Sequence, residues 1–502
     1  IMRAVPIFCT ALLRVVHAAA VGWHDGARQP DQGSVPDDPS CGASDGHGTV
    51  QRVEDDSDEI IALQKVHAQH RTRPRELDPT QQWDTLLDRY PGEFELGSAN
   101  KVAQFPNFSI SRTFPVQDEW ASISRGPPAV CIDGSPYSFQ VMLGDPKKLM
   151  IYFQGGGACW NEISSAAPLC TTFVHNMGYT GVFDRHNESN PYKTHTIVHI
   201  NYCSGDAHVG NASSQRFRVQ NSEGRWVKAK QMGYYNALAG IEWIKEQPWY
   251  EHGSLDLLVV MGCSAGSLGA QPWAPTLLRE FPAVYQSVVA DSYLGIFPEG
   301  TQGPIIGKTF NACGLPLLSS SLAASCDAGT ITVQEMVEEA LSTTDFGNVS
   351  WTYVNSKTDA VQISFYSAIC LLGPGNLSQL ISPDEYYALV NEVLLQYESV
   401  SELDLSAFIV EGCLHCFTPS SEFIGADGLG TGPVWVGPRG NASDAVPPVL
   451  EDWLARLSGP LARAGEQAGW WKTDRYVCDS GGESPRPDGA GPAAHEPLGC
   501  LE

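Results

Sequence analysis

The segment Leu255-Asp256-Leu257-Leu258-Val259-Val260-Met261 runs directly into Gly262-Cys263-Ser264-Ala265-Gly266, and this junction decides the fold. The first seven residues are almost continuously apolar, which is typical of a strand buried on both faces of a parallel sheet. The next five form a G-x-S-x-G sequence, whose small residues tolerate the strained backbone of a sharp turn between a strand and a helix. The junction therefore predicts a strand, a tight turn that exposes the Ser264 hydroxyl, and a helix.

Further apolar runs alternate with helical patterns along the middle of the chain. The predicted strands comprise residues 148–153, 196–202, 287–290 and 407–410. One helix is predicted where apolar residues recur on one face of 234–244, and another where Ser382 precedes Pro383 and Glu385, a typical helix start. Buried strands separated by helices predict an α/β fold, doubly wound, with helices on both faces of a mostly parallel sheet.

The ends of the 502-residue chain differ from its middle in composition. Residues 1–20 combine a basic residue, an apolar stretch and three alanines, which predicts a signal peptide. Residues 21–104 are polar and acidic and residues 479–502 are rich in Pro, Gly and Ala, so both are predicted to be mostly disordered. Residues 105–478 are predicted to form one α/β domain.

Charge and cysteine content limit the partners and the cellular compartment expected for the protein. A net charge of −26 argues against binding to nucleic acid or anionic membranes, and no later segment approaches the ~20 apolar residues of a membrane span. Fourteen cysteines and six Asn-x-Ser sequons predict a secreted, extracellular or cell-wall glycoprotein with disulfide bonds. The sequons are at Asn107, Asn187, Asn211, Asn348, Asn376 and Asn441.

The turn at Ser264 has the features of a nucleophile site. A serine exposed at such a turn can attack a carbonyl carbon, while the amide of Ala265 points at the carbonyl oxygen. A second donor is expected from the three glycines that follow strand 148–153, and we assign it to Gly156 and Gly157, because bare glycine amides can approach an oxyanion. The alternatives are a tight turn with a buried serine and a flexible glycine turn.

A serine nucleophile needs a base and a carboxylate that orients the base. In this kind of fold the chain order is serine, acid, histidine, and His415 follows a predicted strand after Ser264, whereas His495 lies in the tail. Among the aspartates between the serine and the histidine, the candidates for the acid are Asp291, Asp345 and Asp359. Spacing favours Asp359 over Asp291 only slightly, so the acid stays open on the residues alone.

Seven segments in this order resemble the pectin acetylesterase/Notum family of secreted serine carboxylesterases, which have an α/β-hydrolase-type fold. They are Val130–Pro136, Gln154–Cys159, Tyr202–Asp206, Gly262–Gly266, Ala290–Ser292, Thr358–Gln362 and Leu414–Cys416. The resemblance implies a catalytic domain with Ser264, Asp359 and His415 as its triad, Gly156, Gly157 and Ala265 as its oxyanion hole, and disulfides among the cysteines of these segments.

The resemblance also sets the expected substrates. It implies a carboxylic ester hydrolase that removes acyl groups, acetyl first among them, from a polysaccharide such as pectin. The alternatives are a protein O-deacylase that removes a lipid, and a catalytically silent glycan-binding glycoprotein. Gln154 and Ala158 replace the usual Glu and Trp of the family, so we expect an altered approach to the site.

No cofactor is predicted. The pairs Asp206 with His208 and His195 with His199 lack the third ligand and the helix that a metal site needs. Nothing in the sequence fixes the oligomeric state.

Overall fold

The computed structural model describes residues 108–112, 121–343, 349–400, 405–410, 412–423, 433–435 and Leu454. The predicted signal peptide, most of the predicted N-terminal extension and the predicted tail lie outside the described residues. The boundaries 105 and 478 of the predicted domain lie outside them as well.

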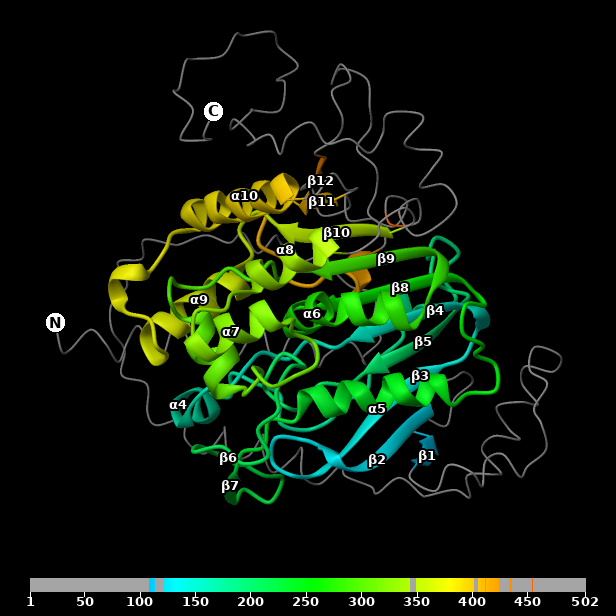
Figure 1. The fold of residues 1–502 in the computed structure, drawn as a ribbon, viewed down its shortest axis with the longest axis horizontal. Helices are drawn as coiled ribbons and strands as arrows, with labels where there is room; N and C mark the ends of the chain where they lie inside the picture. Colours follow the sequence, from blue (N-terminus) through cyan, green and yellow to red (C-terminus); the bar gives the residue numbers. More distant parts are fainter. Residues whose placement is uncertain are drawn as a thin grey trace, which may run out of the picture.

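A ten-stranded sheet runs through the molecule (Figure 1). Its strands, in spatial order, are β1 (Phe108–Arg112), β2 (Ala121–Val130), β3 (Pro136–Met142), β5 (His195–Ile200), β4 (Asp145–Phe153), β8 (Leu255–Cys263), β9 (Ala283–Asp291), β10 (Val349–Ser356), β11 (Leu405–Val410) and β12 (Pro433–Trp435). The six strands from β5 to β11 are parallel to one another, and the outer strands pair antiparallel. A separate hairpin joins β6 (Arg218–Gln220) to β7 (Trp226–Lys228).

The helices connect these strands. They are α4 (Glu162–Ala166), α5 (Gly233–Lys245), α6 (Ala265–Glu280), α7 (Ser320–Ala328), α8 (Val333–Thr343), α9 (Ala360–Leu372) and α10 (Pro383–Val400), with short turns η2 (Gly181–Phe183), η3 (Gly303–Thr309), η4 (Leu377–Gln379) and η5 (Ser421–Phe423). No described helix is both long and apolar enough to cross a bilayer.

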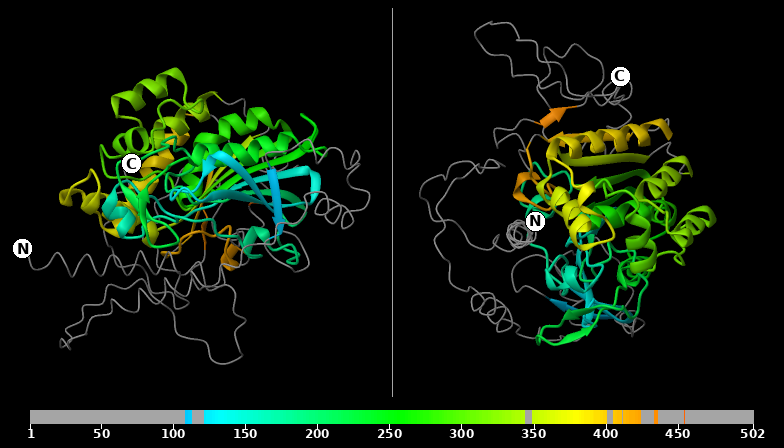
Figure 2. Two further views of the ribbon diagram at one scale, coloured as in Figure 1. Left: turned by 90° about the horizontal axis from the view of Figure 1, so that it is seen from below. Right: turned by 90° about the vertical axis from the view of Figure 1, so that its left-hand side faces the viewer.

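Alternate side chains of each central strand enter two separate cores, because successive residues of a strand point to opposite faces. Leu149, Ile151 and Phe153 of β4 join the core that α5, α6, α8, α9 and α10 cover. Met150 and Tyr152 join the second core, which among the described residues includes η2, η5 and the segment around Phe417. Figure 2 shows the long helices gathered on one side of the sheet and the orange 412–423 segment on the other.

The predicted α/β fold with a mostly parallel sheet is confirmed. The four predicted strands correspond to β4, β5, β9 and β11, and the helix start at Ser382 has reciprocal bonds between Ser382 and Glu385. The sequence analysis missed β10, the antiparallel strands β1 to β3 and β12, and the hairpin strands β6 and β7. In β10 every residue is buried although four of the eight are Ser, Thr or Asn, so its pattern lacks the apolar run used for the other strands.

Three buried histidines make stability depend on pH. Burial lowers the pKa of His195 and His199 to about 3 and that of His208 to about 4. Unfolding exposes imidazoles that bind protons below about pH 6.5, so the unfolded state gains protons as the pH falls and the free energy of unfolding decreases. Burial raises the pKa of Asp206 to about 6 and also raises the pKa of Asp291, so the folded state protonates these carboxylates at a higher pH than the unfolded state, which partly offsets this loss. We therefore expect the midpoint of thermal unfolding to fall between about pH 6.5 and pH 4. A constant midpoint over this range would contradict the expectation.

Candidate active site

Ser264 occupies the turn between β8 and α6. Its backbone has φ 58° and ψ −125°, a left-handed conformation that a non-glycine residue rarely adopts. The turn packs tightly on the end of β4, since a Cβ on Gly266 would lie 2.0 Å from the carbonyl oxygen of Phe153. The Ser264 amide donates to the Asp291 carbonyl at 2.9 Å, which fixes the turn against β9. Sterics and hydrogen bonding thus hold the strained conformation that the G-x-S-x-G sequence predicts.

Asp359 and His415 form a buried pair beyond the ends of β10 and β11. The His415 Nδ1 lies 3.0 and 2.8 Å from the two carboxylate oxygens of Asp359, whose side chain is fully buried. Asp359 is also the N-cap of α9 and accepts from the Val361 and Gln362 amides, while the Gln362 side chain donates to its Oδ2 at 2.9 Å. These bonds leave the carboxylate one orientation, in which it faces His415.

The other ring nitrogen of His415 is available for chemistry. Nε2 is buried and has no hydrogen-bond partner among the described residues. A ring nitrogen of His415 and the sulfurs of Cys263 and Cys416 lie within 4.8 Å of one another, which places the imidazole beside the residue that precedes Ser264. The two sulfurs form a disulfide, so they are not free as thiolate ligands for a metal.

Two of the three predicted oxyanion residues, Gly157 and Ala265, line a pocket together with Ser264, whereas Gly156 is not among its lining residues and packs against Thr171 and Tyr202. Gly157 adopts φ 72°, and a Cβ there would lie 2.0 Å from the Leu169 carbonyl, so the position requires glycine. The carbonyls of Gly156 and Gly157 accept from the Thr171 amide and the Tyr202 hydroxyl. Ala265 is the first residue of α6, so its amide has no acceptor within the helix. Gly157, Ser264 and Ala265 line the same pocket.

Buried polar side chains fix the glycine loop in place. The His208 ring lies 2.8 Å from the Gln154 carbonyl through Nε2, and the Gln154 Oε1 accepts from the Tyr202 amide at 2.8 Å. Asp206 accepts from the Ser204 hydroxyl and from the amide of Gly233 at the start of α5. We expected Gln154 to line the approach to the site, but its side chain is buried and braces the loop, whereas Ala158 does line the pocket.

The pocket beside Ser264 is almost entirely apolar. Its hydroxyls come from Ser264 and Tyr293, and burial followed by the charge of Asp359 raises the pKa of Tyr293, so its phenol stays neutral. Apolar lining residues include Leu268, Phe297, Ile305, Phe310, Met336 and Phe365. Several come from η3, α8 and α9, which no local motif marks as part of a site, so the sequence analysis missed them.

The structure thus brings Ser264, Asp359, His415, Gly157 and Ala265 to one edge of the sheet. Of the three candidate acids, Asp359 contacts the histidine. Asp291 instead bonds to the amides of Phe417 and Thr418, and Asp345 lies outside the described residues. Gln362, which braces Asp359, was contained in one of the resembling segments but received no role there.

Comparison with known proteins extends these observations. Two solved crystal forms of the Wnt deacylase Notum from Drosophila are 16% and 17% identical to this chain; each alignment covers 61% of this chain and 87% of the other, with a TM-score of 0.40. An esterase from Pyrococcus furiosus is 12% identical over 58% of this chain and 82% of its own, with a TM-score of 0.28. No curated protein is a significant match to the chain. Residues 121–304 match the family model described as pectinacetylesterase. This part of the chain is therefore similar to the pectinacetylesterase family, which is the resemblance that its motifs predict.

Proposed function

We propose that the protein is a serine carboxylesterase that works through an acyl-enzyme on Ser264. The observation that carries the proposal is the His415–Asp359 pair, whose imidazole lies beside Cys263, the residue before Ser264, and whose Nε2 has no hydrogen-bond partner among the described residues. Such a pair is built to accept a hydroxyl proton, because a carboxylate on Nδ1 keeps the proton there and leaves Nε2 as the base.

The proposed reaction has two halves. The His415 Nε2 takes the proton of the Ser264 hydroxyl while the serine oxygen attacks the ester carbonyl carbon. The amides of Gly157, Gly156 and Ala265 hold the resulting oxyanion, and His415 returns the proton to the leaving alcohol. A water molecule, deprotonated by the same imidazole, then attacks the acyl-serine, and His415 returns this proton to the Ser264 oxygen as the bond to the acyl group breaks and the carboxylic acid leaves. Asp359 stabilises the imidazolium in both halves.

The apolar pocket provides information on the length of the acyl group that the protein removes. An acetyl group offers a single methyl, whereas this pocket presents side chains from α6, η3, α8 and α9, including Leu268, Ile305 and Phe365. Burying an aliphatic chain there contributes about 0.8 kcal/mol per CH₂. The pocket therefore favours removal of a longer aliphatic acyl group, as in the O-deacylase alternative, over the acetyl-polysaccharide activity that the sequence placed first.

We further propose that the protein is secreted and glycosylated. Among the described residues, disulfides join Cys131 to Cys203, Cys159 to Cys170, Cys263 to Cys416 and Cys313 to Cys326, a content typical of proteins from oxidising compartments. Of the sequons that the structure describes, Asn376 is exposed and Asn187 and Asn211 are partly exposed.

A fluorophosphonate probe tests the proposed function directly, because it phosphonylates only an activated serine. We expect a single labelled site at Ser264, found by peptide mass spectrometry, and no labelling of the Ser264→Ala variant. A folded protein that stays unlabelled would instead favour a silent glycan-binding role.

A series of p-nitrophenyl esters tests the acyl preference. We expect kcat/KM to rise about fourfold for each CH₂ added beyond acetate until the pocket is filled, which corresponds to about 0.8 kcal/mol per CH₂. Acid release from acetylated pectin, acetylated xylan and serine peptides with an aliphatic O-acyl group would then identify the carrier. A steady decline of kcat/KM from acetate onward would restore the acetyl assignment.

A further inference from the structure

Four neighbouring strands each carry one buried group at their carboxyl ends. Ser264 follows β8, Asp291 ends β9, Asp359 follows β10, and His415 follows β11. Strands lie about 4.8 Å apart, so β8 and β11 are separated by about 14 Å. The segment after β11 must therefore cross the ends of β10 and β9 to bring the His415 imidazole close to the Ser264 hydroxyl.

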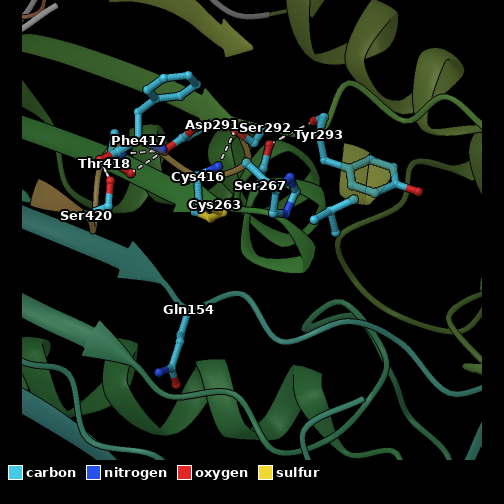
Figure 3. The surroundings of a disulfide bond; sticks show 12 residues. Gln154, Cys263, Ser267, Asp291, Ser292, Tyr293, Cys416, Phe417, Thr418 and Ser420 are labelled. Carbon is cyan, nitrogen blue, oxygen red and sulfur yellow. Dashed lines mark hydrogen bonds between the residues drawn. A yellow bond between two sulfur atoms is a disulfide. The ribbon is translucent and has the colours of Figure 1, made fainter. Parts of the chain in front are cut away.

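The Asp291 side chain binds this crossing segment through hydrogen bonds. Its Oδ2 accepts from the Phe417 amide at 2.9 Å, the Thr418 amide at 2.6 Å and the Thr418 hydroxyl at 2.7 Å. Its Oδ1 accepts from the Ser292 hydroxyl, which in turn accepts from the Cys416 amide at 2.8 Å. Figure 3 shows these bonds around Asp291.

The same residue also holds the nucleophile. The Asp291 main-chain carbonyl accepts from the Ser264 amide at 2.9 Å, and the residue has no exposed surface. Asp291 therefore bonds to Ser264 through its backbone and to Phe417 and Thr418 through its side chain, while Ser292 links it to Cys416. The disulfide from Cys263 to Cys416 joins the same two segments covalently (Figure 3).

We propose that Asp291 is a positioning residue for the reaction, which fixes His415 relative to Ser264 by clamping residues 416–418 over β9. This inference rests on the proposed function. A buried carboxylate suits the task because it has two acceptor oxygens, which here accept four hydrogen bonds, whereas an asparagine of the same size has only one. The disulfide limits how far residues 416–418 can move, and the hydrogen bonds to Asp291 fix their position over β9.

The test compares Asp291→Ala, Asp291→Asn and Ser292→Ala with the unaltered protein on a p-nitrophenyl ester. Loss of all acceptors in Asp291→Ala should lower kcat about 10²-fold, the cost of misplacing a catalytic group by about 1 Å, with KM nearly unchanged. Asp291→Asn should recover part of this loss, since its amide oxygen can still accept from Phe417 and Thr418. Ser292→Ala, which removes only the bond to Cys416, should have the smallest effect. If Asp291→Ala does not fold, the other two variants decide.

Leu258→Ala is the matched control for stability. Leu258 is buried in β8, six residues before Ser264, and its truncation destabilises the protein by leaving a cavity. We expect Leu258→Ala to lower the unfolding midpoint but to keep kcat per folded molecule. Unchanged kcat in the folded Asp291 and Ser292 variants, or a loss no larger than their loss of folded protein, would overturn the positioning role. Ser264→Ala and His415→Ala are measured alongside: if these retain activity, the proposed function itself fails, and if they alone lose it, only the role of Asp291 fails.

Discussion

Replacing Ser264 with alanine should reduce p-nitrophenyl ester hydrolysis by about 10⁶-fold, to the level left by binding and the oxyanion amides alone. The physical reason is that alanine removes the oxygen that forms the acyl bond, and no neighbouring group can replace it. The adjacent Cys263 cannot act as a substitute nucleophile, because its sulfur is bonded to Cys416. Initial rates with p-nitrophenyl acetate and with longer esters measure the effect.

The fold should survive this substitution. Alanine keeps the Cβ and the backbone amide that donates to Asp291, so we expect an unchanged circular dichroism spectrum and unfolding midpoint. Ser287→Ala, a buried serine in β9, is the matched control and should keep full turnover. Turnover by Ser264→Ala close to that of the unaltered protein would refute the assignment of the nucleophile.

The second large effect is expected at Asp359. Replacement with asparagine should lower kcat about 10⁴-fold, because an amide that donates to Nδ1 forces the imidazole into the tautomer with its proton on Nε2, where it can no longer act as a base. The asparagine oxygen can still cap α9 by accepting from the Val361 and Gln362 amides, so folding should be retained. The measurement is kcat against pH for both proteins.

An exposed aspartate provides the control for charge. Asp384 lies in the first turn of α10 and is exposed, so Asp384→Asn removes the same charge without touching the site. We expect its turnover to equal that of the unaltered protein. Retention of full kcat by Asp359→Asn would show that Asp359 serves only as a helix cap, and would return the choice of acid to the other aspartates.

Local sequence patterns predicted several elements of the fold. The apolar run before Gly262 predicted β8, the small residues around Ser264 predicted the turn into α6, and the Ser382 box predicted the start of α10. These features depend on residues within a few positions of one another, so local sequence patterns are sufficient to predict them. Strand β10 was missed because its buried Ser, Thr and Asn residues are satisfied by partners elsewhere in the chain, such as Gln362 for Asn355.

The sequence by itself determined the types of group available and their order: a glycine loop, a serine in a tight turn, several aspartates and a histidine after a late strand. Spacing along the chain could not choose among the aspartates, and the preference for Asp359 came from family resemblance. Only the tertiary structure decided that Asp359 contacts His415, that Asp291 binds the segment beyond it, and that η3, α8 and α9 enclose an apolar pocket. The reason is physical. Asp359 and His415 lie 56 positions apart in the chain, and Cys263 and Cys416 lie 153 apart. Which of these distant residues meet depends on the order of the strands in the sheet, which no local pattern encodes.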